Sequence, residues 1–290
     1  MMKIIECPRD AMQGISKFIA TEDKAKYINK LLTAGFDTID FGSFVSSKAI
    51  PQMADTAEVL SLLDLQNSNT KLLSIIANER GAEQACLYPQ INYLGFPFSV
   101  SETFQQRNTG GSIAEAVTRV KNINNLAKAH NKETVVYLSM GFGNPYGDHW
   151  DIDILHKWLD ELASLGINTF SISDTVGLAT NDIVNDVFTQ VQSKFETLEI
   201  GAHLHSRPDN APEKIKAAYT AGVRRFDTAI AGYGGCPMAG DGLVGNISTR
   251  TLLAFLNQQQ VQTLADQQYI NELEANFLAL VESNENVIEH

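Results

Sequence analysis

Two histidines separated by one residue are the side chains in this sequence best suited to bind a metal ion. His203 and His205 end the apolar run 199–205 (EIGAHLH), and residues two apart on a strand point to the same face. Ala202 and Leu204 make the opposite face apolar, which suits packing under helices. We therefore expect both imidazoles to point into the interior of the fold as metal ligands. Hydrogen-bonded core histidines are the alternative.

An arginine and an aspartate stand side by side where the first apolar run, 3–7 (KIIEC), ends. Asp10 offers a carboxylate oxygen and Asn246 an amide oxygen. Together with two imidazoles they form a donor set for a divalent ion, with positions left for substrate and water. Mg²⁺ or Mn²⁺ fits this set, and Zn²⁺ is compatible with it. Arg9 is expected to splay away from Asp10 and to face an oxyanion; a salt bridge across the mouth of the fold is the alternative.

Eight short apolar or β-branched runs alternate with longer helical patterns, which predicts a parallel sheet flanked by helices. The expected strands lie near 3–7, 37–41, 71–77, 91–96, 134–140, 168–173, 199–205 and 225–230. The expected helices lie near 22–34, 52–64, 80–87, 113–130, 151–165, 181–195, 210–221 and 248–258.

The most economical fold for eight such units is α/β, a (β/α)₈ TIM barrel. Apolar residues at helical spacing over 262–283 add a C-terminal helix. We expect one domain over 1–290, with the barrel over about 1–260 and a helical extension over about 261–290. A doubly wound open sheet is the alternative fold.

Functional side chains of a barrel gather where strands end and the following loops begin. Closing the barrel makes the eighth strand the neighbour of the first and the seventh, so Asp10 and the two histidines lie about 10 Å apart at the backbone and can meet. The further polar residues expected at this face are Gln13, Asp40, Ser43, Asn78, Ser139, Asp174, Thr175 and Cys236.

Composition and charge exclude several classes of partner. The net charge of −12 repels phosphate backbones, so we expect no nucleic-acid partner. No apolar run reaches the roughly 18 residues of a membrane helix, and no export signal precedes the first strand. Three widely spaced cysteines form neither a disulfide framework nor a zinc motif. These features predict a cytoplasmic protein without a membrane partner.

Several collinear segments resemble hydroxymethylglutaryl-CoA lyase. They are Arg9-Asp10 with Gln13, "SFVSSKAIPQMADTAEV" at 43–59, "SISDTVG" at 171–177, the histidine pair, and "AGYGGCPMAGDGLVGN" at 231–246. The glycine-rich loop with its cysteine is the most specific of them. The wider family comprises metal-dependent carbon–carbon lyases and Claisen synthases on TIM barrels.

The resemblance implies cleavage of 3-hydroxy-3-methylglutaryl-CoA to acetyl-CoA and acetoacetate, or of a close 3-hydroxyacyl-CoA. It implies metal ligation by Asp10, His203, His205 and Asn246. Arg9 would hold the enolate oxygen, Asp174 would be a candidate base, and Cys236, as a protonated thiol, would deliver the proton to carbon.

The other residues that we expect in the site contact the substrate or CoA, or take part in catalysis. Asp40 is grouped with the catalytic residues. Gln13, Ser43, Ser139 and Thr175 are candidate substrate contacts. Lys48 and Arg107 are candidates for contacts with the phosphates of CoA, although the sequence contains no phosphate-binding fingerprint. A homodimer is compatible with the sequence, which encodes no oligomeric state.

Four positions depart from the lyase pattern. Asp40 stands where the lyases have Glu, Ser206-Arg207 where they usually have Asp-Thr, and Arg250 where an acidic residue is usual. These changes leave the acyl-CoA substrate open. Two other functions also remain open: a Claisen-type synthase resembling isopropylmalate or citramalate synthase, and a weakened barrel that binds without catalysis. The short segment after the last barrel helix favours the lyase.

Overall fold

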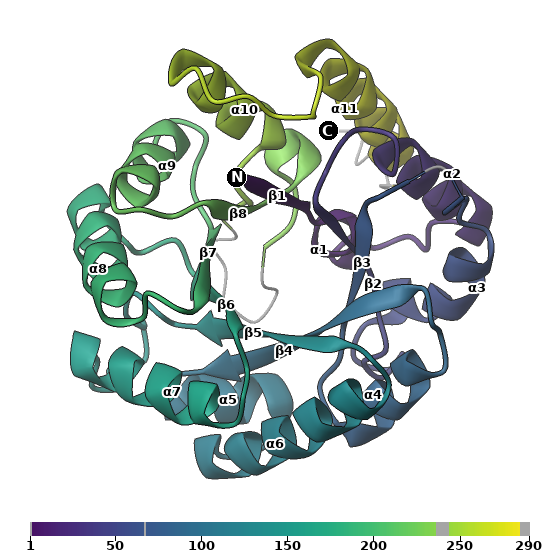
Figure 1. Ribbon diagram of the computed structural model, residues 1–290. Coiled ribbons are helices and arrows are strands. Elements are labelled where there is room, and N and C mark those ends of the chain that lie inside the picture. The colour runs from purple at the N-terminus through teal and green to yellow at the C-terminus, as the bar shows by residue number, and fades with distance from the viewer. Residues whose placement is uncertain (1, 67, 236–243, 285–290) are drawn as a thin grey trace, which may run out of the picture.

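The computed structural model describes residues 2–66, 68–235 and 244–284. Within them the strands follow one another in chain order around a closed parallel barrel, and β1 pairs with β8 to complete the circle (Figure 1). The predicted (β/α)₈ barrel is therefore confirmed, and the open sheet is excluded. The strands are β1 (Lys3–Glu6), β2 (Thr38–Ser43), β3 (Lys71–Ile75), β4 (Ile91–Ser99), β5 (Glu133–Ser139), β6 (Thr169–Asp174), β7 (Glu199–Leu204) and β8 (Arg225–Thr228).

Helices form a ring around the strands (Figure 1). Those at predicted positions are α2 (Thr21–Leu31), α3 (Thr56–Ser61), α4 (Glu79–Cys86), α6 (Ile113–Ala129), α7 (Ile152–Ser164), α8 (Asn181–Lys194), α9 (Ala211–Thr220), α10 (Thr249–Gln258) and α11 (Gln267–Glu282). Short 3₁₀ turns occupy η1 (Pro51–Met53) and η2 (Ile230–Gly232). Ser112 caps α6 in the capping box expected from Glu115 three residues later.

Two helices were not predicted: α1 (Pro8–Gln13) and α5 (Glu102–Thr109). α1 is too short to show an apolar period, and its start is marked only by Pro8 in the first turn. α5 is mostly polar, with Ser101 as its cap. Both helices follow a strand directly, β1 and β4, so they line the mouth of the barrel rather than its outer ring.

The apolar core has two layers, as a barrel of strands buried on both faces requires. One continuous cluster fills the space between the strands and the helices. A smaller cluster lies on the inner face and is formed by Leu73, Ile75, Tyr93, Val135 and Tyr137. These inner residues come from neighbouring strands β3, β4 and β5, so one side of the barrel interior is apolar.

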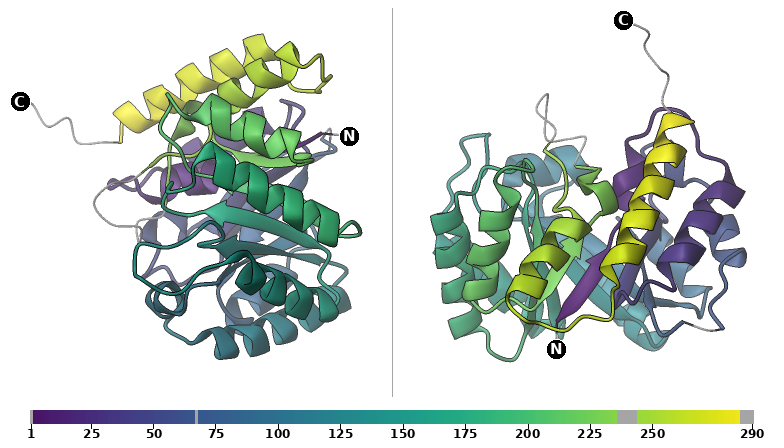
Figure 2. Two further views of the ribbon diagram at one scale, coloured as in Figure 1. Left: turned by 90° about the vertical axis from the view of Figure 1, so that its left-hand side faces the viewer. Right: turned by 90° about the horizontal axis from the view of Figure 1, so that it is seen from above.

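The additional C-terminal helix is present as α11. It packs against α2, α10 and η2, and Figure 2 shows it lying along the barrel beside α10. Its buried face consists of Ile270, Leu273, Phe277 and Val281, and all four are apolar residues at helical spacing in the predicted segment 262–283. None of the helices in the described ranges is long and apolar enough to cross a membrane.

Candidate active site

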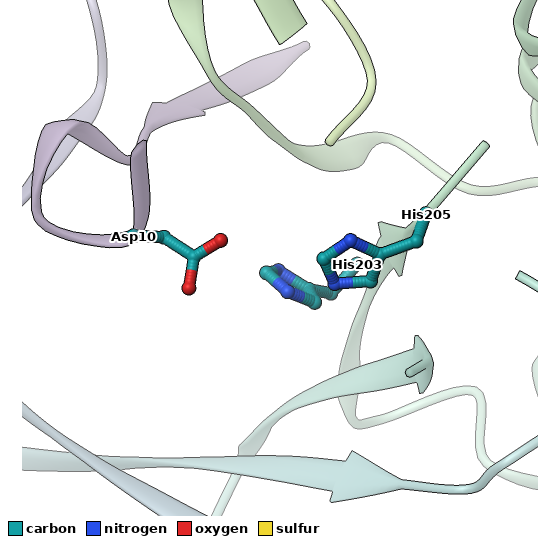
Figure 3. A group of neighbouring side chains, drawn as sticks. All are labelled: Asp10, His203 and His205. Atoms are coloured by element: carbon teal, nitrogen blue, oxygen red, sulfur yellow. The ribbon is translucent and has the colours of Figure 1, made fainter. Parts of the chain in front are cut away.

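Asp10, His203 and His205 converge at the mouth of the barrel. Each offers one ligand atom, and these atoms all lie within 4.8 Å of one another. Asp10 comes from α1, directly after β1, whereas His203 is in β7 and His205 follows that strand. Figure 3 shows the carboxylate of Asp10 facing the two imidazole rings. Both histidines therefore point inward, as the two-residue period of the strand predicts.

The two imidazoles are held by their Nδ1 atoms. Nδ1 of His203 donates to Oδ2 of Asp227 at 3.1 Å, and Nδ1 of His205 donates to the carbonyl of Val244 at 3.2 Å. A ring that donates from Nδ1 keeps the lone pair of Nε2 for a metal ion. One carboxylate and two neutral imidazoles suit a divalent cation, so the residues present fit the metal that the sequence predicts.

Burial and charge set the protonation of this cluster. Burial raises the pKa of Asp10, but Arg9 and the two histidines outweigh it and bring that pKa to about 2. Burial and the neighbouring His203 lower the pKa of His205 to about 4. Burial lowers the pKa of His203 too, but the hydrogen bond to Asp227 and nearby carboxylates raise it above its usual value. Asp10 is thus anionic and His205 neutral at pH 7, as metal ligation requires.

Arg9 is clamped by two carboxylates and an amide. Its Nε donates to Asp40 at 3.0 Å, and its Nη2 donates to the same Asp40 oxygen. Its Nη1 donates to Asp10 Oδ1 and to Gln13 Oε1, both at 2.9 Å. The expectation that Arg9 and Asp10 splay apart is therefore wrong: both lie in the short helix α1, where their side chains meet. The guanidinium still lines the cavity described below.

Asp40 lies behind Arg9 rather than in the cavity. Its side chain is fully buried, and burial raises its pKa to about 6 although Arg9 opposes that rise. One of its oxygens, Oδ1, has no hydrogen-bond partner among the described residues. In this arrangement Asp40 orients the guanidinium.

Asn246 contacts the candidate metal ligands through its amide nitrogen. Nδ2 donates to Asp10 Oδ2 at 2.5 Å and to the carbonyl of Tyr233 at 2.8 Å. Asn246 is thus beside the site, as the sequence predicts. Ligation by its Oδ1 would require the amide to turn over.

A cavity of about 270 Å³ opens in front of these residues. On the β1 and β5–β7 side its lining is mainly polar and includes Gln13, Ser139, Ser173 and Thr175 beside Arg9, Asp10 and the histidines. On the β2–β4 side the lining is mainly apolar and includes Val45, Ile50, Ile75, Ala77, Pro97 and Phe104. Such a cavity can hold a molecule that is charged at one end and apolar along one side.

Besides Asp40 and Asn246, four further predicted site residues do not line this cavity. Asp174 is buried, and its carboxylate accepts from Lys214 Nζ at 2.6 Å. Ser43 lines a neighbouring cavity of about 410 Å³, and its hydroxyl accepts from the backbone of Val45. Lys48 is exposed on the loop after β2. Arg107 is exposed on α5 with its guanidinium over the ring of Tyr146, 4.6 Å from the centroid.

Cys236 lies outside the described residues, so its predicted position over the site stays a prediction. The two arginines that depart from the lyase pattern do not reach the cavity. Arg207 is exposed, and Arg250 lies 3.2 Å from Glu274 of α11. Both belong to the surface around the barrel.

Sequence reasoning missed three residues of this region. Tyr137 stands two residues before the predicted Ser139 on β5, so the alternation of the strand could have indicated it. Asp227 lies on β8, which pairs with the strand of His203, so strand pairing in the barrel could have indicated it. Tyr137 lines the cavity with its ring edge on His203, 5.5 Å between centroids. Its hydroxyl has no hydrogen-bond partner within the described ranges. Lys214 gave no signal, because a lysine in a helix usually reaches solvent.

The barrel and its mouth define a class of protein: a TIM-barrel protein whose mouth brings together a carboxylate and two histidines that could hold a divalent ion, with an arginine beside them. Comparison with known proteins specifies this class. The HMGL-like family pattern matches residues 2–276, and the chain belongs to that family. With it, the chain belongs to the carbon–carbon lyases.

Relatives of known name agree with this assignment. The hydroxymethylglutaryl-CoA lyase YngG of Bacillus subtilis (strain 168) is 34% identical, over 88% of this chain and 85% of its own. The 3-hydroxy-3-isohexenylglutaryl-CoA/hydroxy-methylglutaryl-CoA lyase of Pseudomonas aeruginosa is 31% identical, over 89% and 85%. A solved HMG-CoA lyase of Acinetobacter baumannii, in complex with coenzyme A and 3-methylmalate, superposes with a TM-score of 0.90 and 27% identity and covers 100% and 97% of the two chains.

Proposed function

We propose that this chain cleaves 3-hydroxy-3-methylglutaryl-CoA to acetyl-CoA and acetoacetate with the help of Mg²⁺ or Mn²⁺. The observation that carries the proposal is the convergence of Asp10, His203 and His205 beside Arg9 in one cavity. The names of the bacterial relatives support the choice of substrate.

Cleavage breaks the bond between C2 and C3 of the acyl group. The C3 hydroxyl loses its proton and becomes the ketone of acetoacetate, while C2 takes up a proton and becomes the methyl group of acetyl-CoA. A divalent ion held by Asp10, His203 and His205 would make the hydroxyl more acidic. The residues of the chain must then stabilise the thioester enolate and supply the proton to C2.

Arg9 is the group proposed for the enolate oxygen. Its guanidinium lines the cavity while Asp40 fixes it from behind through two nitrogens. A positive charge fixed in advance stabilises a developing oxyanion without reorganising during the reaction. Its Nη1, which contacts Asp10 at 2.9 Å, is the nitrogen that would be left for the substrate with Asp10 serving as a metal ligand.

Proton transfer is assigned on chemical grounds. Cys236 remains the proposed donor to C2, because an ordinary thiol is protonated at neutral pH. Asp174 remains the candidate base from the sequence. To accept the proton of the alcohol, it would have to leave its contact with Lys214.

A panel assay tests the proposal. Protein freed of metal with EDTA is supplied with Mg²⁺ or Mn²⁺ and offered 3-hydroxy-3-methylglutaryl-CoA, and acetyl-CoA and acetoacetate are measured. The panel includes a thioester with a longer C3 branch, because the name of the Pseudomonas relative includes 3-hydroxy-3-isohexenylglutaryl-CoA beside the hydroxymethyl compound. We expect metal-dependent formation of both products in equal amounts.

Two outcomes would contradict this function. Condensation of acetyl-CoA with a 2-oxo acid, without cleavage, would make the protein a synthase. Binding of the thioesters without turnover at any metal concentration would make it a binding protein. Either result would leave the fold and the metal centre unaffected.

A further inference from the structure

Lys214 is a fully buried lysine that lies outside the cavity, on α9 behind β7. Its Nζ donates to Asp174 Oδ2 at 2.6 Å, to the carbonyl of His205 at 2.9 Å and to the carbonyl of Gly177 at 3.3 Å. An ammonium group has three N–H donors, and here each has an acceptor. The buried charge is therefore both paired and fully hydrogen-bonded.

The three acceptors belong to the segments that build one side of the site. Asp174 ends β6, Gly177 lies in the loop after it, and His205 follows β7. His205 also forms an isolated bridge with Asn246, and its ring donates to the carbonyl of Val244. The ammonium group thus connects the loop after β6 with the peptide of a candidate metal ligand. His205 in turn contacts the segment that carries Asn246.

Two other buried lysines show what a purely structural lysine does in this chain. Lys24 donates to Asp55 and to the carbonyl of Gln52. Lys132 donates to the carbonyls of Tyr88 and Ile91, both at 2.7 Å, at the start of β5 and so at the end of the barrel away from the site. Among these three lysines, Lys214 differs in that one acceptor is the peptide of a residue whose side chain faces the cavity.

We propose that Lys214 is a positioning residue of the metal centre. It fixes the peptide of His205, so that the imidazole faces Asp10 and His203 before a cation binds. This inference rests on the metal site of the proposed function. Without the ammonium group, the buried carbonyl of His205 loses a donor and the buried carboxylate of Asp174 loses its counter-charge, and both groups must shift to find new partners.

The test is a calorimetric titration of Mn²⁺ into metal-free protein. The proteins compared are the wild type, Lys214→Met and the control Lys132→Met, which also removes a buried ammonium group but at the other end of the barrel. Residues that orient metal ligands typically contribute about 10–100-fold to metal affinity. We expect a loss of that size in Lys214→Met and no loss in Lys132→Met, with saturating Mn²⁺ restoring most of the turnover of Lys214→Met.

The double variant Asp174→Asn/Lys214→Met separates positioning from charge balance. It leaves no unpaired buried charge, so it can also replace Lys214→Met if that variant fails to fold. We expect its Mn²⁺ affinity to stay low, because the carbonyl of His205 still lacks its donor. Recovery of wild-type affinity would overturn the inference and reduce Lys214 to the counter-ion of Asp174.

Wild-type affinity in Lys214→Met, or an equal loss in Lys132→Met, would likewise overturn the inference. If the wild type itself bound no Mn²⁺, the metal dependence of the proposed function would fail first, and the role of Lys214 with it. A wild type that binds Mn²⁺ but cleaves no thioester would leave the role of Lys214 standing while the proposed reaction fails.

Discussion

Replacing Asp227 by asparagine perturbs the metal centre without touching its proposed ligands. Oδ2 of Asp227 accepts from Nδ1 of His203 at 3.1 Å and from the hydroxyl of Ser171 at 3.0 Å, and the side chain is fully buried. Asparagine keeps the shape and one acceptor but loses the charge. The ring of His203 then becomes less basic and a weaker ligand. We expect a loss of about 10–100-fold in Mn²⁺ affinity, or about 1.4–2.7 kcal/mol.

The pH dependence of this loss distinguishes it from general damage. Burial lowers the pKa of His203, but the hydrogen bond and charge of Asp227 raise it above its usual value. At pH 6, protons therefore compete with Mn²⁺ for His203 more strongly in the wild type than in Asp227→Asn, because His203 has a lower pKa in the variant. The gap in affinity should be largest near pH 8 and should narrow at pH 6.

Calorimetric Mn²⁺ titrations of both proteins at the two pH values measure this gap. Ser171→Ala serves as the control, because it removes the other donor to the same carboxylate oxygen. Equal affinities at pH 8, or a gap that does not change with pH, would refute the reasoning that Asp227 acts through the basicity of His203.

Three further changes test other parts of the molecule. Arg9→Lys cannot hold Asp40 through two nitrogens, so kcat should fall by about 10²–10³ with little change in Mn²⁺ affinity; loss of Mn²⁺ binding instead would make Arg9 a structural partner of Asp10. Cys236→Ala should lower kcat by about 10²–10⁴ with unchanged metal content, and full activity would remove Cys236 from the mechanism. Burial raises the pKa of Glu6 to about 8 against the hydrogen bonds from Thr249 and Ile230. Its stabilising effect is therefore complete below pH 4.5 and lost as the pH rises to 8, so melting temperatures of Glu6→Gln should fall less over this range than those of the wild type.

The barrel could be predicted because its signals are local and repeated. Each strand is a short apolar run, and the turns between helices and the next strand contain Gly35, Gly166 and Gly222, which adopt positive φ angles. The helices α1 and α5 could not be predicted, because neither buries a regular apolar stripe against the barrel. They form where the chain turns over the mouth, and tertiary contacts there replace the periodic pattern.

The candidate site was predictable where strand geometry alone decides. The period of two turns His203 and His205 to the same side, and barrel closure brings Asp10 to them. The positions of Asp40 and Asp174 were not predictable in this way. Asp40 lies within β2 and Asp174 ends β6, yet each carboxylate turns to a buried cation, Arg9 or Lys214. Which carboxylates face the cavity depends on cations supplied by helices, and strand alternation holds no information about those.

The four residues that depart from the lyase pattern differ in whether they lie near the cavity. Arg250 lies on Glu274, and Arg207 is exposed, so neither adds charge to the cavity. Ser206 is buried, but its hydroxyl donates to the carbonyl of Arg207 and its amide to that of Gly245. These contacts hold Ser206 on the backbone beside His205, and it does not line the cavity.

Asp40 contacts Arg9 directly in spite of its short side chain, so the guanidinium keeps a carboxylate behind it. Asp40 and Ser206, the two departures that lie at the site, therefore contact Arg9 and the backbone beside His205. The residues proposed to contact the substrate are the same as in the lyase pattern. We expect a change of substrate within this family to arise on the other side of the cavity, where β2–β4 and the segments after them present a mainly apolar lining and no charged side chain among the described residues. For the proposed reaction, we expect this side of the cavity to select thioesters by the size of the C3 branch.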